Sequence, residues 1–138
     1  MSSSSRRLAG ILMLVFPTVI FGGASILAMM IGDPAYLDNP IRRDLWRAGH
    51  AHAGVLLILS LVVLRYVDET RLSPGVRTFA RLSVPVAAVM LPIAFFSSVL
   101  SAEDTEPGVI VYLAYAGAVV LVAGLLTVGV GLLRRPQK

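Results

Sequence analysis

The sequence predicts an all-α integral membrane protein whose four transmembrane helices form an up-down-up-down bundle. Two observations carry this prediction. Hydrophobic residues make up 57% of the 138-residue chain, and its few charges gather between apolar runs long enough to span lipid, which takes roughly 20 helical residues. These runs also lack the alternating pattern of barrel strands, so helices are the spanning structure that satisfies its own backbone polar groups.

The expected spans are the four apolar runs at residues 8–31, 45–67, 79–100 and 109–133. The connections between them are short and rich in turn-forming residues, which leaves no room there for a separate soluble domain. We therefore expect one transmembrane domain that covers residues 1–138. Asp44 directly precedes the second run and is expected to cap its helix, because a carboxylate there accepts a hydrogen bond from a free backbone N–H group.

The first run follows Arg6 and Arg7 and has the basic-then-apolar order of a signal peptide. Its apolar part is longer than a typical signal core. We therefore expect the run to be retained as the first span, with the paired arginines as a topological anchor.

Basic residues set the expected orientation, because Lys and Arg near span ends are retained on the cytoplasmic side. With four spans, both termini and the middle loop share one side. The basic residues on that side are Arg6, Arg7, Arg65, Arg71, Arg77, Arg81, Arg134, Arg135 and Lys138. The other side has only Arg42, Arg43 and Arg47, among acidic loops. We predict a multi-pass inner-membrane protein with cytoplasmic termini. Its arginines face anionic lipid headgroups, and no nucleic-acid partner is expected.

The fourth run carries a glycine stripe, Gly117, Gly124 and Gly131, which recurs every seven residues. Small residues at such spacing let membrane helices approach closely, and the partner helix can belong to this chain or to another. One functional hypothesis is therefore a non-catalytic accessory subunit that packs through the stripe as a homo-oligomer or within a larger membrane complex. A transporter or channel is disfavoured, because spans one, three and four carry no charged residue at mid-depth.

The segment RAGHAHAGVLLIL, residues 47–59, contains the only two histidines, His50 and His52. A helix that starts near Asp44 places them one to two turns below the outer surface. Because residues two apart point about 200° from one another, one helix does not present both rings to one small ion. We expect His50 to face inward beside Gly49, and His52 to face lipid or another subunit.

Histidine at this depth has two interpretations. An imidazole is an amphipathic ring that suits the membrane interface, and it is also a preferred ligand for haem iron, copper and zinc. RAGHAHAGVLLIL resembles the haem-bearing histidine helices of the main subunits of haem-copper oxidases and nitric oxide reductases. The part GHAHAGVL is also similar to a segment of small bacterial four-span membrane proteins.

The resemblance to the oxidase helices covers one helix, and it implies haem b or copper and membrane redox chemistry carried by His50 or His52. This chain departs from those subunits because it has no histidine on another helix. One copy therefore cannot provide a bis-histidine haem between two helices. Three ways to hold a haem remain: a histidine/methionine pair, a five-coordinate haem, or a dimer with one histidine from each copy.

Candidate partners for a ligating histidine lie at a similar depth. Met29 and Met30 end the first run, and their thioethers would suit Cu(I) or a histidine/methionine haem, although packing methionines are the alternative. Tyr112 and Tyr115, together with Arg47, are candidates to orient the ligand, although tyrosines also serve as interfacial anchors. The chain has no cysteine, which excludes iron–sulfur clusters and thiolate chemistry.

Overall fold

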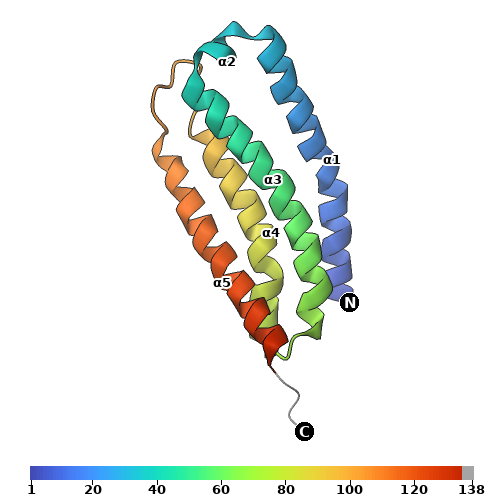
Figure 1. Cartoon of the computed structure of the whole chain (residues 1–138). Coiled ribbons are helices and arrows are strands. Elements are labelled where there is room, and N and C mark those ends of the chain that lie inside the picture. Colours follow the sequence, from blue (N-terminus) through green and yellow to red (C-terminus); the bar gives the residue numbers. More distant parts are fainter. Residues whose placement is uncertain (135–138) are drawn as a thin grey trace.

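The computed structural model describes residues 1–134, in which short connections join helices and no strand occurs. Four long helices run alternately up and down the molecule (Figure 1). In chain order they are α1 (Ser3–Gly32), α3 (Pro40–Tyr66), α4 (Pro74–Ser97) and α5 (Leu113–Leu133). The shorter elements are α2 (Pro34–Asp38), η1 (Val67–Glu69) and η2 (Val109–Tyr112). Arg135 and Lys138, which contribute to the predicted orientation, lie outside the described residues.

The four long helical segments agree in number with the four expected runs. Each is long and apolar enough to cross a membrane, so the chain has the character of a multi-pass membrane protein. The bounds of these segments are Ser3–Gly32, Pro40–Glu69, Pro74–Ser97 and Val109–Leu133. The first three begin five residues before the expected spans, because polar residues at the ends of the apolar runs continue the helix.

The expected cap at Asp44 is wrong. Helix α3 begins at Pro40, and the side chain of Asn39 caps it by accepting a hydrogen bond from the backbone N–H of Arg42 at 3.0 Å. Proline suits the first helical turn because its fixed φ matches the helix and its missing N–H group would have no helical partner. The apolar pattern starts only after this polar turn. A helix start predicted from that pattern therefore lies too late in the chain.

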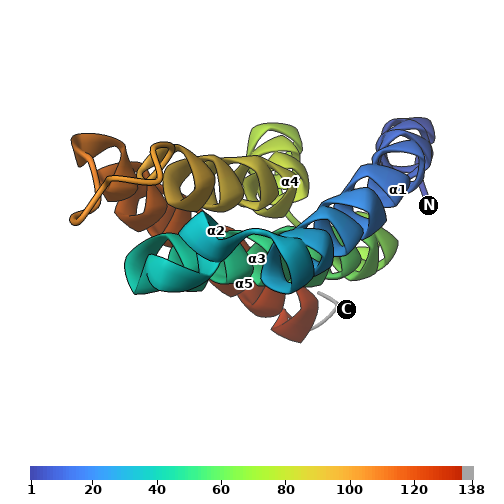
Figure 2. The same ribbon diagram turned by 90° about the horizontal axis from the view of Figure 1, so that it is seen from above.

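The long helices pack in the order α1, α3, α4, α5. The main packing pairs are α1 with α3, α3 with α4, and α4 with α5, and α1 and α5 lie on opposite sides of the inner pair (Figures 1 and 2). Half of the apolar window of α4 is buried, but only 11% of the windows of α1 and α5. Most apolar side chains on the outer helices therefore face outward, as expected for helices surrounded by lipid.

The three glycines of the stripe are buried in contacts within this chain. A methyl group built at Gly124 would overlap the side chain of Ser83 on α4, and one at Gly117 would overlap Leu91 on the same helix. A methyl group at Gly131 would lie 3.0 Å from side chains of the connection before α4. The stripe thus faces α4 and the connection that precedes it.

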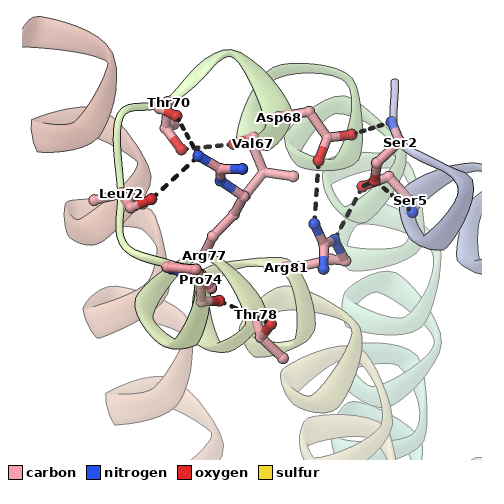
Figure 3. Close-up of polar contacts among 10 residues, drawn as sticks. All are labelled: Ser2, Ser5, Val67, Asp68, Thr70, Leu72, Pro74, Arg77, Thr78 and Arg81. Carbon is pink, nitrogen blue, oxygen red and sulfur yellow. Dashed lines mark hydrogen bonds and ion pairs between the residues drawn. The ribbon is translucent and has the colours of Figure 1, made fainter.

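A polar network joins three segments at the end of the molecule that carries the N-terminus (Figure 3). Asp68 of η1 accepts a hydrogen bond from the backbone N–H of Ser2 at 2.6 Å and pairs with Arg81 of α4 at 3.1 Å. Arg81 Nε also donates to the hydroxyl of Ser5, which is fully buried in α1. Nearby, Arg77 donates to two carbonyl groups of the connection before α4. The bonds of Asp68 and Arg81 therefore connect the start of α1, η1 and α4.

Candidate functional site

An open groove of about 620 Å³ lies between α1 and α3, at the end of the molecule where α1 ends and α3 begins. It brings together three of the candidate residues, namely His50, Met30 and Arg47, and adds the carboxylate of Asp44. The rest of its lining is apolar or small: Gly23, Ile26, Leu27, Ala48 and Ala51. We call this the His50 groove.

Two glycines of α1 make room for the imidazole of His50. A Cβ atom built at Gly23 would lie 2.8 Å from His50 Nε2 and 2.9 Å from Cε1, which is closer than real contacts allow. A Cβ atom at Gly22 would lie 3.9 Å from Nδ1. The ring is therefore packed between α1 and α3, and its nitrogen atoms are directed toward the glycine backbone.

His52 packs against a different helix. Its ring centroid lies 5.1 Å from that of Phe95 on α4. The ring therefore faces a neighbouring helix of the same chain, whereas the sequence predicted that it faces lipid or another subunit. His52 Nδ1–H donates to the carbonyl of Ala48 at 2.8 Å. Because a carbonyl only accepts, this bond selects the tautomer whose Nε2 carries the lone pair. The two histidine rings thus contact opposite neighbours of α3, α1 and α4.

The remaining candidate residues are only partly gathered around the His50 groove. Met30 lines it, whereas Met29 does not. Tyr112 and Tyr115 are 67% and 70% exposed and stack on one another, with ring centroids 6.1 Å apart. They are carried by η2 and α5, which pack on α4, so the structure does not bring them to the groove.

The groove has few ligands for a bare metal ion. Within residues 1–134, no three His, Cys, Asp or Glu side chains come together to hold one. The imidazole of His50, the thioether of Met30 and the carboxylate of Asp44 are the donors that line it. A cofactor that brings its own metal ligands needs fewer protein donors than a bare ion.

An aromatic cluster that the apolar pattern of the sequence does not predict supports this end of the molecule. The guanidinium of Arg42 lies 4.4 Å from the ring centroid of Trp46, one helical turn later. Trp46 also contacts the rings of Tyr36 at 6.1 Å and Phe96 at 5.9 Å, which join α2, α3 and α4. Tyr36 is fully buried, and burial raises the pKa of its hydroxyl. The i, i+4 spacing of Arg42 and Trp46 is the sequence signal that could have revealed part of this cluster.

Comparisons of the chain with protein-family models, curated proteins and solved structures find no match. The segment that carries the resemblance to haem-bearing helices, residues 47–59, lies within α3. It provides His50 and Arg47 to the groove, and α1 provides Met30.

Proposed function

We propose that the chain is a small membrane redox protein that would hold haem b in the His50 groove, with His50 as a ligand to its iron. The observation that carries the proposal is the meeting of an imidazole, a thioether and a guanidinium in one groove with small and apolar walls. Its volume of about 620 Å³ falls within the range of roughly 300–1,000 Å³ that is usual for cofactor sites. Bound haem would supply one-electron chemistry.

The donor set favours haem over a bare ion. Porphyrin contributes four nitrogen ligands itself, so one or two protein ligands are sufficient. Copper held by His50 is the second candidate, because imidazole is also a preferred ligand for copper. Arg47 also lines the groove, and its cation is complementary to the carboxylates that a haem carries.

The dimensions of the groove also favour an extended ligand. Met30 follows Gly23, the residue against which His50 packs, by seven positions, or about 10 Å along a helix. A ligand that contacts both His50 and Met30 therefore has to extend along the groove. Ligation also requires the His50 ring to turn from the backbone of α1 into the groove. The small side chains of Ala48 and Ala51, which line the groove, leave space for this movement.

The accessory-subunit alternative loses its main support. It was based on the glycine stripe, and Gly117, Gly124 and Gly131 are all buried in contacts within this chain. The stripe is therefore not free to receive a second copy or a larger complex.

The test is the visible spectrum of the purified full chain after expression with a haem precursor, together with metal analysis. We expect a Soret band and a b-type pyridine haemochrome in the wild type. His50→Ala should abolish both, whereas His52→Ala, which removes a ring facing α4, is the matched control and should retain them. Met30→Ala should weaken haem retention without changing the spin state, because Met30 lines the groove about 10 Å along α1 from the residue on which His50 packs and would contact the porphyrin, not the iron.

Two outcomes would contradict this proposal. A wild type that contains neither haem nor stoichiometric copper would rule out the redox function. If His52→Ala lost the cofactor and His50→Ala kept it, the assignment of the site to the α1–α3 side would be wrong.

A further inference from the structure

A second groove runs between α1 and α4 and starts at the opposite end of the molecule from the His50 groove. Its mouth has a volume of about 440 Å³ and is lined by Ser4, Arg7, Thr78 and Arg81, with apolar side chains behind them. We call this the basic mouth. An apolar groove of about 610 Å³ follows it, and Leu8 and Ile11 line both parts. The two parts are therefore adjacent along α1, and we call the second the apolar shaft.

The apolar shaft has the length and chemistry of one lipid leaflet. It extends on α1 from Leu8 to Val19, which is about 16 Å at the helical rise per residue. Half of a bilayer core roughly 30 Å thick is about the same length. Ala53 and Leu57 of α3 form its floor, and the side chain of Val89 on α4 contributes to one wall. Of the described residues that line it, only Thr18 is polar, and its hydroxyl donates a hydrogen bond to a backbone carbonyl.

The basic mouth carries positive charge that is not fully compensated. Arg7 is exposed and forms no ion pair with another described residue. Arg81 uses Nη2 for Asp68 and Nε for Ser5 (Figure 3), which leaves Nη1 without a protein partner among residues 1–134. Among residues 1–134, no carboxylate lines the mouth. Two guanidinium groups beside the hydroxyls of serine and threonine are a favourable setting for a phosphate group.

We propose that this groove binds one anionic phospholipid, with its phosphate in the basic mouth and one acyl chain in the apolar shaft. The charge of the mouth favours an anionic headgroup over a zwitterionic one, and the depth of the shaft matches an acyl chain in one leaflet. A second copy of the chain in the same orientation is a poorer occupant. The two carboxylates at this end, Asp68 and Glu69, are already paired with Arg81 and Arg65.

The experiment measures lipid retention by native mass spectrometry of the full chain, after exchange in mixed micelles that contain phosphatidylglycerol or phosphatidylcholine. We expect selective retention of one phosphatidylglycerol. Arg7→Gln should weaken it about fivefold, since a basic residue near anionic lipid contributes about 1 kcal/mol. Arg71→Gln, at an exposed arginine of the same end that does not line the groove, is the matched control. It should change retention by less than about twofold.

A second pair of variants tests the shaft. Val89→Trp should fill it and reduce retention, whereas Val122→Trp, at a similarly exposed valine on α5 outside the groove, should not. Equal retention of the two lipids, or equal losses in Arg7→Gln and Arg71→Gln, would overturn the proposal. The proposal would also be overturned if inorganic phosphate alone raised the melting temperature as much as phosphatidylglycerol does. A dimer of the chain that Val89→Trp disrupts would overturn it as well, because a second copy would then occupy the groove. None of these readouts depends on haem, because the His50 groove lies at the other end.

Discussion

Arg81 of α4 and Asp68 of η1 form an ion pair in which Arg81 Nη2 lies 3.1 Å from Asp68 Oδ1, and 14% of each side chain is exposed. The same carboxylate accepts a hydrogen bond from the backbone N–H of Ser2. One acidic side chain therefore connects the N-terminal segment, the end of the α3–η1 segment and α4. Helix α1 packs mainly on α3, so this network is a link from α1 to α4 at this end.

Replacing Asp68 should destabilise the protein. Asp68→Ala leaves Arg81 partly buried without its partner, and we expect the free energy of unfolding to fall by about 2 kcal/mol, between the values for exposed and buried pairs. Thermal unfolding in detergent measures the change. Glu69→Ala is the control, because its pair with Arg65 is at least half exposed. It should cost less than about 0.5 kcal/mol, and equal losses in the two variants would contradict the prediction.

Gly124 should not tolerate a methyl group. Gly124→Ala forces a Cβ atom into the side chain of Ser83, and we expect a loss of about 1–3 kcal/mol from overpacking. Gly129→Ala on the same helix is the control, because a Cβ atom there meets nothing within 4 Å. Ser83→Gly should recover part of the loss in the double variant. If Gly124→Ala and Gly129→Ala melted at the same temperature, close contact between α4 and α5 would not depend on the stripe.

The packing of His50 on Gly23 predicts an energetic coupling between them. Gly23→Ala should lower the free energy of unfolding in the wild type, since its Cβ atom would lie 2.8 Å from His50 Nε2, but much less in a His50→Ala background. The coupling from this double-mutant cycle should be about 0.5–3 kcal/mol. Gly10→Ala, where a Cβ atom has open space, should show no coupling to His50. Additive effects of Gly23→Ala and His50→Ala would place the ring elsewhere.

Asn39 has two separable roles. Its Oδ1 atom caps α3, and its Nδ2 group donates to the carbonyls of Ala102 and Asp104, both at 2.9 Å. Asn39→Asp retains the oxygen that caps α3 and loses the Nδ2 donor, whereas Asn39→Ala loses both. Because loss of the cap alone costs about 1 kcal/mol, we expect Asn39→Asp to destabilise the protein about half as much as Asn39→Ala. Thermal unfolding again measures both. Identical melting temperatures for the two variants would mean that only the bonds to Ala102 and Asp104 matter.

The excess of arginine at one end predicts the orientation of the chain in the membrane. A reporter fused after Lys138 should behave as cytoplasmic, and one inserted at residues 101–108 should behave as external. The physical reason is that loops rich in Lys and Arg resist translocation, whereas the acidic segment that contains Glu103 and Glu106 has no cation. An external signal from the C-terminal fusion would reverse the predicted topology.

The number and type of the long elements could be predicted from the sequence because lipid offers the backbone no hydrogen bonds. An apolar run of sufficient length has to be helical, whatever it packs against. The angular separation of His50 and His52 also follows from helix geometry alone, and their contacts with opposite neighbours of α3 agree with it. Helix starts were less predictable. Asn39 and Pro40 begin α3 in a polar turn that carries no apolar pattern.

By itself, the sequence determined the four apolar helices, the glycine spacing on α5 and the different directions of the two histidines, since each depends on residues that are near one another in the chain. Only the tertiary structure decided which residues share a groove. Helix α1 packs on α3 and α5 packs on α4, so Met30 joins His50, whereas Tyr112 and Tyr115 do not. The groove between α1 and α4, with Arg7 and Arg81 at its mouth, likewise arises from the lateral order of the helices. That order depends on which helix surfaces fit together, and local periodicity does not encode it.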